Sequence, residues 1–257
     1  MSGTPSLPAL VPSLPWLTAR PIAHRGLHDA ARGVIENTAS AAQAAMAGGY
    51  GIEADLQISA DGEAMVHHDD ALGRLTDGAG ALRDMTASAL AGVPFRATAD
   101  RMMTLGDLLD LVSGRVPLVI ELKSRFDGDL RLAGRASAVL AGYAGPAAVM
   151  SFDPAPIIAL RHRAPRLCRG IVALRRYRGA EWRRLTASQR LALPWLAHGR
   201  HSRPAFVAYR VDDLATLPPR AVRRLGLPLL AWTVRTAQQR AIAARGADQA
   251  IFEGYRP

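Results

Sequence analysis

The chain has 257 residues, which is the size of one α/β barrel domain, and 49% of them are hydrophobic. This composition excludes a largely disordered chain, and the single cysteine, Cys168, excludes an internal disulfide framework or a cysteine-rich zinc module. The net charge is +10, and all but one of the 32 basic residues are arginine. Such a surface attracts anions such as nucleic acid, acidic lipid head groups or phosphorylated metabolites, but a plain compositional bias toward arginine is the simpler interpretation. Aromatic residues are scarce and no nucleic-acid motif is present, so we expect no nucleic-acid partner.

Residues 1–19 are predicted to form a proline-rich arm, and residues 20–257 a single domain. Pro5, Pro8, Pro12 and Pro15 break any continuous helix, so the arm is expected to be extended. No basic segment precedes its apolar residues and no small-residue cleavage site follows, which argues against a signal peptide and predicts a cytoplasmic location. No apolar run approaches the roughly 18 residues that span a membrane.

Short apolar runs alternate with helix-like segments along the rest of the chain. The predicted strands are Pro21–Ala23, Gly51–Gln57, Glu63–His67, Pro117–Leu122, Ala147–Ser151, Gly170–Leu174, Ala205–Tyr209, Leu229–Val234 and Gln249–Phe252. The predicted helices are Glu36–Ala47, Thr104–Val112, Leu130–Leu140, Pro156–Arg163, Pro219–Arg224 and Thr236–Arg245.

This alternation predicts parallel strands joined by right-handed crossovers. An eight-stranded barrel has no place for a ninth strand, so one of the nine candidates is either not a strand or an extra strand at an edge. Gly170–Leu174 has the weakest strand pattern of the nine. The turn-rich residues 71–103 fit an insertion better than a barrel unit.

Two carboxylates lie on one face of the second predicted strand. Glu53 and Asp55 are two residues apart, so they point the same way, while Ile52, Ala54 and Leu56 share the other face. Burying two neighbouring carboxylates is costly, and a divalent cation between them would remove that cost. The alternative is a solvated face on an edge strand.

The same geometry recurs in the fourth predicted strand. Glu121 and Lys123 share a face, and Glu121 could complete an oxygen-rich site suited to Mg²⁺ or Ca²⁺. Lys123, the only lysine, would then add a positive charge suited to phosphate. A simple Glu121–Lys123 ion pair is an equally good interpretation.

Polar residues also follow the first and third predicted strands. His24, Arg25 and Gly26 close the first strand, and the carboxyl ends of strands are where barrel active sites lie. His67 and His68 follow the third; because consecutive strand residues point to opposite sides, only one of them can face the interior.

Two further positions have plainer interpretations. Asn37 lies in the Glu36-Asn37-Thr38 segment, where Asn37 or Thr38 could cap the following helix. Trp232 lies on a late strand, where most tryptophans are core residues.

Taken in order, these segments resemble the glycerophosphodiester phosphodiesterases. The resemblance covers about residues 20–257 and is strongest over 22–123. It is carried by the segments AHRG, ENT, IEADLQ, DGEAMVHHD, TLGDLLD, ELK and AWTV.

The resemblance implies a TIM barrel with a small insertion at about residues 69–103, after the third strand. It implies a single divalent cation, Mg²⁺ or Ca²⁺, and a small glycerophosphodiester substrate. It implies roles for nine residues: metal ligands Glu53, Asp55 and Glu121; a catalytic pair of His24 and His68; phosphate or substrate contacts from Arg25, Lys123, Asn37 and Trp232.

The chain departs from the family pattern at several points. His67 replaces a residue that is usually aromatic or apolar, Arg235 follows the WTV motif where Asn is frequent, and Glu253 lies where many members have a Thr-Asp pair. Residues 164–225 show little specific likeness, which leaves the pocket for the leaving group undefined.

The predicted activity is metal-dependent hydrolysis to glycerol 3-phosphate and an alcohol, with the histidines as general base and general acid. Attack by water and attack by a neighbouring glycerol hydroxyl both remain open. The alternatives are a lysophospholipase D-type enzyme, for which the apolar arm and the arginine-dense residues 161–190 suggest peripheral contact with phospholipid, and a non-catalytic phosphate-binding barrel.

Overall fold

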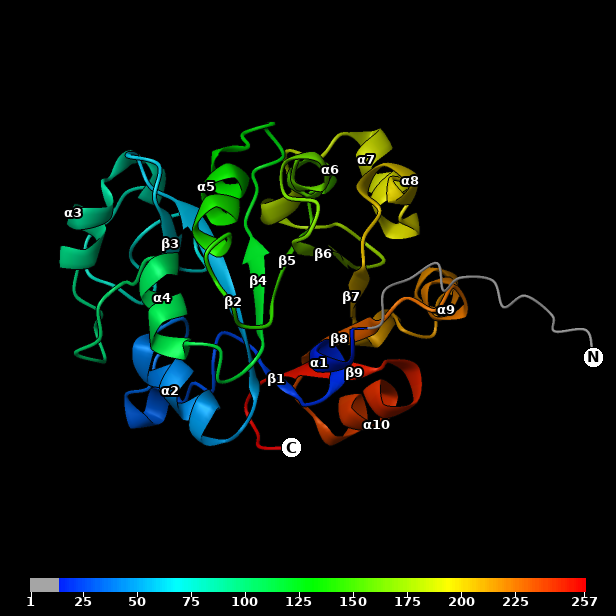
Figure 1. Cartoon of the computed structure of the whole chain (residues 1–257), viewed down its shortest axis with the longest axis horizontal. Coiled ribbons are helices and arrows are strands. Elements are labelled where there is room, and N and C mark those ends of the chain that lie inside the picture. Colours follow the sequence, from blue (N-terminus) through cyan, green and yellow to red (C-terminus); the bar gives the residue numbers. More distant parts are fainter. Residues whose placement is uncertain (1–13) are drawn as a thin grey trace, which may run out of the picture.

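A computed structural model describes residues 14–257, and its centre is a closed barrel of eight parallel strands (Figure 1). The first strand pairs with both the second and the last, which closes the sheet on itself. A ninth strand, β3, pairs antiparallel with β2 outside the barrel. The strands are β1 Ile22–Ala23, β2 Gly51–Ile58, β3 Ala64–Val66, β4 Leu118–Leu122, β5 Ala147–Ser151, β6 Cys168–Ala173, β7 Phe206–Arg210, β8 Leu229–Val234 and β9 Gln249–Phe252.

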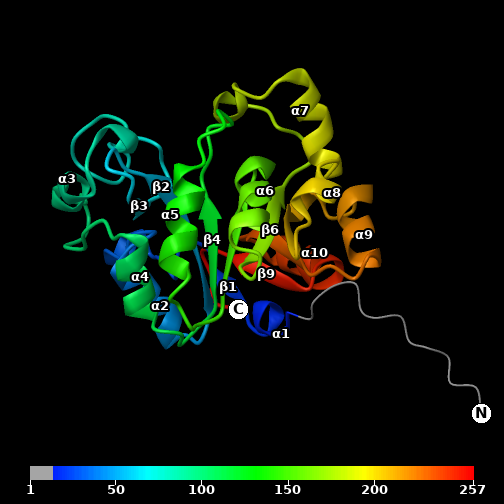
Figure 2. The ribbon, with the colours of Figure 1, turned by 45° about the horizontal axis from the view of Figure 1, so that its top comes forward.

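Helices connect successive strands and cover the outside of the barrel (Figures 1 and 2). The α-helices are α1 Pro15–Thr18, α2 Ala39–Ala47, α3 Ala87–Gly92, α4 Leu105–Val112, α5 Arg131–Leu140, α6 Pro154–Arg163, α7 Ala187–Ala192, α8 Gly199–Ser202, α9 Leu217–Arg224 and α10 Ala237–Gly246. Five short 3₁₀ helices are η1 Ala30–Arg32, η2 Leu82–Asp84, η3 Ala180–Trp182, η4 Leu193–Trp195 and η5 Val211–Asp213. In the described part of the chain, no helix combines the length and the apolar character that crossing a membrane requires.

The alternation of side chains along each strand separates two cores. In β4, Leu118, Ile120 and Leu122 belong to the apolar layer between strands and helices, whereas Val119 lies in a second cluster inside the barrel. Glu121 follows Val119 on the inward face, so it points into the barrel at the carboxyl end of the strand. The period-two pattern thus places the polar residues of a strand at one mouth of the barrel.

The sequence identified the wrong strand as the extra one. Gly170–Leu174 overlaps β6, a full member of the barrel, and the strand outside the barrel is Ala64–Val66. Gly170 weakens the strand pattern for a packing reason: a Cβ at this position would lie 2.3 Å from the Phe206 ring of the neighbouring strand. The glycine therefore makes room for a large buried side chain.

The predicted insertion is confirmed as a small unit beside the barrel. Residues 69–103 contain η2 and α3 and have their own apolar cluster. That cluster covers the outer face of β3 through Met65, and its buried members are Ile35, Met65, Leu82, Leu90, Phe95 and Met102.

The predicted amino-terminal arm lies largely outside the described residues, which begin at Leu14. The part that is described is not extended as expected: Pro15 starts the short helix α1, because proline fits the first helical turn. Leu17 is buried and packs into the cluster inside the barrel together with Ile22 and Phe206. This end of the arm therefore contributes to the barrel core.

Candidate active site

Three buried carboxylates meet at the carboxyl-end mouth of the barrel. Glu53, Asp55 and Glu121 each offer an oxygen, and these oxygens lie within 4.8 Å of one another. β2 and β4 bring them together because their parallel register pairs Asp55 directly with Glu121. All three side chains are buried, so the edge-strand alternative is wrong.

The chemistry of this cluster suits a divalent cation. Burial, reinforced by the neighbouring Asp55 and Glu121 carboxylates, raises the pKa of Glu53 well above its ordinary value. Three close carboxyl oxygens in a buried site form the hard, oxygen-only donor set that Mg²⁺ and Ca²⁺ take. The residues present therefore fit a divalent cation.

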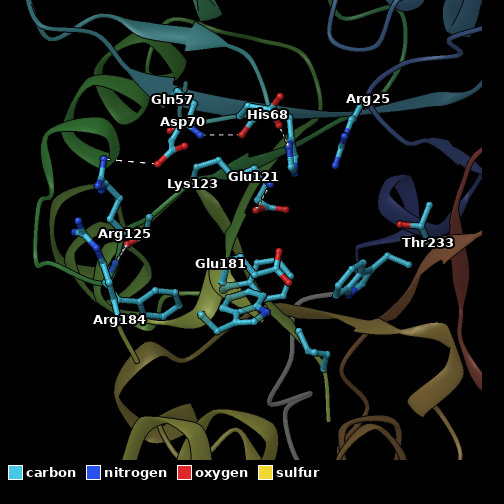
Figure 3. Close-up of a pocket in the computed structure, with 18 of the residues that line it drawn as sticks. Arg25, Gln57, His68, Asp70, Glu121, Lys123, Arg125, Glu181, Arg184 and Thr233 are labelled. Carbon is cyan, nitrogen blue, oxygen red and sulfur yellow. Dashed lines mark hydrogen bonds and ion pairs between the residues drawn. The ribbon is translucent and has the colours of Figure 1, made fainter. Parts of the chain in front are cut away.

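Two basic side chains bind the same cluster. The Lys123 Nζ lies 2.8 Å from Asp55 Oδ1 and 2.7 Å from Glu121 Oε1, and the Arg25 Nε lies 3.1 Å from Asp55 Oδ2. Although burial alone would lower the pKa of Lys123, Asp55 and Glu121 raise it above its ordinary value, so Lys123 is charged. Lys123 also lies in the cavity wall beside Glu121 (Figure 3). It pairs with Asp55 as well as with Glu121, so the contact is more than the simple Glu121–Lys123 ion pair.

The loop after β1 depends on a glycine. Arg25 and Gly26 both have positive φ, and a Cβ on Gly26 would lie 2.8 Å from Ala41 of α2. This turn aims the Arg25 backbone N–H at Glu53 Oε2, which accepts it at 3.0 Å. The histidine-arginine-glycine segment is therefore a tight turn that wraps around the carboxylate cluster.

Asn37 holds Asp55 in place and does not line the cavity. Its side-chain Nδ2 donates to Asp55 Oδ2 at 2.9 Å, and its Oδ1 accepts from the Asp55 backbone N–H at 3.1 Å. The side chain is buried against this carboxylate, and a contact of Asn37 with substrate or phosphate stays a prediction. Because Asn37 serves the site, Thr38 caps α2, which starts three residues later than predicted.

His24 has a carboxylate partner directly after the last strand. The His24 Nδ1 lies 2.6 Å from Glu253 Oε2, and Arg235 donates to the same carboxylate oxygen at 2.8 Å. Burial opposes ionisation of Glu253, but the hydrogen bonds from His24 and Arg235 outweigh it and lower its pKa to about 2. An ionised carboxylate only accepts, so Nδ1 carries the proton. The Nε2 atom is left free, 3.9 Å from Glu53 Oε2.

Burial also lowers the pKa of His24, more than the Glu253 hydrogen bond raises it. The imidazole is therefore neutral near pH 7, with a basic Nε2 beside the carboxylate cluster. Glu253 and Arg235, noted in the sequence only as departures from a pattern, form its support.

We predict that Glu253→Gln lowers kcat about 10- to 100-fold with little change in KM, because the variant loses a charge-assisted hydrogen bond worth about 1.5–3 kcal/mol. Steady-state kinetics on a glycerophosphodiester test this. Glu253→Asp should recover part of the loss, and an unchanged kcat in Glu253→Gln would contradict the supporting role.

His68 lies in the cavity wall, whereas His67 is buried away from it. The His68 Nδ1 lies 2.8 Å from Asp69 Oδ1, so this imidazole also has a carboxylate on its Nδ1 side. His67 packs near Phe95 of the insertion, with ring centroids 6.3 Å apart. The structure therefore separates two neighbours that strand periodicity alone left equivalent.

An ion-pair chain connects the two halves of the site. Glu36 accepts from Arg25 at 2.7 Å and from Arg74 at 2.6 Å, and Arg74 also binds Asp69 at 2.6 Å. Asp69 in turn orients His68. Arg74 lies in the insertion, so the insertion helps to orient a histidine of the site.

The site opens into a cavity of about 750 Å³. One side carries Arg25 and Thr233, and the far side carries Arg125 and Arg184 (Figure 3). His24 also lines this cavity. Aromatic side chains form part of the wall, and Trp232 lies among them, with its Nε1 donating to the Ala208 carbonyl at 3.1 Å. The other aromatic members of the wall are Phe126, Phe152 and Trp182.

Sequence reasoning missed several lining residues. Gln57 continues the inward face of Glu53 and Asp55, so the period-two pattern could have identified it, and it donates to the His68 carbonyl at 2.8 Å. Residues 180–184 come from the segment that resembles the family least, and only the fold reveals that they reach the cavity.

Solved structures with the same fold include two phosphodiesterases. A phosphodiesterase from Oleispira antarctica, in complex with the product sn-glycerol-3-phosphate, aligns with a TM-score of 0.73 at 21% identity, covering 93% of this chain and 95% of that one. A glycerophosphodiester phosphodiesterase from Thermotoga maritima aligns with a TM-score of 0.68 at 22% identity, covering 90% and 92%. At these identities the likeness supports the fold.

Sequence comparisons are more specific. A glycerophosphodiester phosphodiesterase from Caldanaerobacter subterraneus is 38% identical over 111 residues, which cover 40% of this chain and 44% of that protein. Glycerophosphodiester phosphodiesterase 1 from Bos taurus is 49% identical over 67 residues, covering 25% and 19%. The matched part thus spans less than half of either relative. The family model described as the glycerophosphoryl diester phosphodiesterase family, however, matches residues 24–253, and the chain belongs to this family.

Proposed function

We propose that this chain is a metal-dependent phosphodiesterase that hydrolyses glycerophosphodiesters to glycerol 3-phosphate and an alcohol. One observation carries the proposal: a buried Glu53, Asp55 and Glu121 cluster lies at the barrel mouth beside His24, with His68 in the same cavity. The family match and the product bound to the Oleispira antarctica protein support the same substrate class.

The three carboxylates would hold one divalent cation, with Mg²⁺ and Ca²⁺ as the candidates. When bound, such a cation supplies Lewis-acid neutralisation of the phosphate charge. Lys123 and Arg25 add positive charge at the same place, and their ion pairs with the carboxylates hold them beside the phosphate position. Trp232 offers an apolar surface for the carbons of glycerol.

The two histidines move the protons in this proposal. His24 acts as general base through its unprotonated Nε2, because Glu253 keeps the proton on Nδ1. His68 protonates the departing alcohol oxygen, and Asp69 orients it for this step. Water and the neighbouring glycerol hydroxyl are both acceptable nucleophiles in this arrangement. Attack by water gives glycerol 3-phosphate directly, whereas attack by the hydroxyl expels the alcohol and leaves a cyclic phosphate, which water then opens to glycerol 3-phosphate.

The experiment is a turnover assay with glycerophosphocholine and Mg²⁺ or Ca²⁺, in which glycerol 3-phosphate is measured by a coupled dehydrogenase. We expect product with a divalent cation and none after chelation. Tight substrate binding without any turnover would favour the non-catalytic phosphate-binding barrel instead.

Metal binding should stabilise the protein more at higher pH. The pKa of Glu53 is raised above its ordinary value of about 4.5, so its contribution to the stability of the metal-free protein is complete below that value. The contribution is lost as pH rises through the raised pKa. Binding to the ionised cluster removes this loss, so saturating Mg²⁺ or Ca²⁺ should raise Tm by about 5–10 °C at pH 8 and by less at pH 5. Differential scanning calorimetry checks this, and a shift that is larger at pH 5 would contradict it.

A lysophospholipase D-type activity is the second candidate. The observation that favours it is the aromatic wall of Phe126, Phe152, Trp182 and Trp232, which provides apolar surface beyond what glycerol needs. Comparing kcat/KM for glycerophosphocholine and lysophosphatidylcholine tests it. No turnover of the long-chain substrate would eliminate this candidate.

A further inference from the structure

The connection from β6 to β7, residues 174–205, forms a folded cap above the barrel mouth (Figure 2). This cap has its own apolar cluster, so it is a platform with fixed shape. It also lines the active-site cavity through residues 180–184. The buried members of its cluster are Leu174, Tyr177, Trp182, Leu185 and Leu193.

Most of the net positive charge of the chain is carried by this cap. It contains eight arginines and a single acidic residue, Glu181, so it carries +7 of the total charge of +10. Arg184 pairs with Asp127 at 3.5 Å, and Arg190 donates to the carbonyls of Tyr177 and Trp182 inside the cap. The other six are exposed, and within residues 14–257 none lies within 4.0 Å of a carboxylate; they are Arg175, Arg176, Arg178, Arg183, Arg200 and Arg203.

The same cap exposes two large apolar side chains. Leu191 at the end of α7 is 74% exposed, and Trp195 at the end of η4 is 63% exposed. Leu193 and Pro194 between them are buried, so this stretch packs one side into the cap and turns Leu191 and Trp195 outward. The cap thus combines an exposed tryptophan with exposed arginines that have no carboxylate partner in residues 14–257. This combination matches the chemistry of a membrane interface, where an amphipathic ring lies at head-group level.

We propose that the 174–205 cap docks on an anionic lipid bilayer, with Leu191 and Trp195 entering the head-group layer and the six unpaired arginines facing acidic head groups. The positive charge of the cap is complementary to the acidic head groups of an anionic bilayer, whereas a neutral bilayer offers no such attraction. A nucleic-acid surface would use the arginines but would give no reason for an exposed leucine. Because Arg183 belongs both to the cap and to the cavity wall, docking would place the mouth of the cavity next to the lipid surface.

The test is flotation of the full-length protein with vesicles of phosphatidylcholine alone and of phosphatidylcholine with 30% phosphatidylglycerol. We expect binding only to the anionic vesicles and weaker binding at high salt. Arg176→Glu/Arg178→Glu should lower the partition coefficient at least about tenfold. Leu191→Ser/Trp195→Ser should lower it several-fold while the salt dependence remains.

Helix α9 provides matched controls, because Leu217 and Leu225 are 65% and 70% exposed and Arg220 and Arg224 are exposed arginines without ion pairs in the described chain. Leu217→Ser/Leu225→Ser and Arg220→Glu/Arg224→Glu should leave the partition unchanged. Equal losses in the control variants, or no flotation of the wild-type protein, would overturn the proposal.

Sedimentation velocity without lipid tests whether a second copy of the chain, instead of a bilayer, covers the cap surface. If the cap variants convert an oligomer to a monomer, the cap is an interface between copies and the proposal fails. Binding to vesicles is measured without turnover, so this test and the test of the proposed catalytic activity fail independently.

Discussion

Glu53→Gln is expected to reduce the release of glycerol 3-phosphate by about a thousandfold or more and to abolish the Tm shift produced by Mg²⁺ or Ca²⁺. The substitution keeps the shape of the side chain but removes one of the three carboxylates in a buried cluster. Lewis-acid stabilisation is worth several kcal/mol, and each 1.4 kcal/mol is a factor of ten in rate. Steady-state kinetics together with calorimetry check both parts of the expectation.

Glu63→Gln is the matched control for this variant. Glu63 follows β2 and pairs with Arg135 on the outside of the barrel at 2.7 Å, away from the cavity. It should retain the activity and the Tm shift of the wild-type chain. An active Glu53→Gln, or a Glu63→Gln variant that is equally impaired, would contradict the assignment of the metal site.

Substitution of either cavity histidine has the second-largest expected effect. His24→Ala and His68→Ala should each lower kcat about 10²- to 10⁴-fold, because each removes one proton-transfer group. Both variants should retain the metal-dependent Tm shift, since neither residue belongs to the carboxylate cluster.

His67→Ala distinguishes chemistry from packing. His67 is 2% exposed and packs near the insertion, so its loss should reduce stability while kcat changes less than threefold. If His67→Ala abolished turnover and His68→Ala did not, the assignment of these two neighbours would be reversed.

The period-two pattern of side chains identified much of the site. It put Glu53 and Asp55 on one shared face and Glu121 and Lys123 on another, and the structure brings these four residues together. The pattern is reliable here because both faces of the barrel strands are buried, so a polar residue in such a strand needs a partner.

Other parts of the site depend on contacts between distant segments, which no local pattern encodes. The 2.6 Å contact between His24 and Glu253 exists because closure of the barrel pairs β1 with β9. The same limit explains why the sequence alone could not decide whether Asn37 caps a helix or contacts the substrate. Only the fold places its amide against Asp55.

The misidentified strand has a related cause. Gly170 reads as a weak strand residue by itself, but the barrel requires it because Phe206 occupies the space of a side chain. Conversely, Ala64–Val66 is apolar because Met65 packs in the cluster of the insertion and Ala64 and Val66 pack in the main core. Apolar character alone therefore does not distinguish a barrel strand from a covered outer strand.

Anomalous diffraction from crystals soaked in Mn²⁺ or Ca²⁺ with glycerol 3-phosphate would locate the proposed metal site itself. We expect one strong peak within bonding distance of Glu53, Asp55 and Glu121, with a phosphate oxygen on the same ion and His24 and His68 on either side of the phosphate. A fully occupied ion elsewhere, or a phosphate bound away from the three carboxylates, would contradict it.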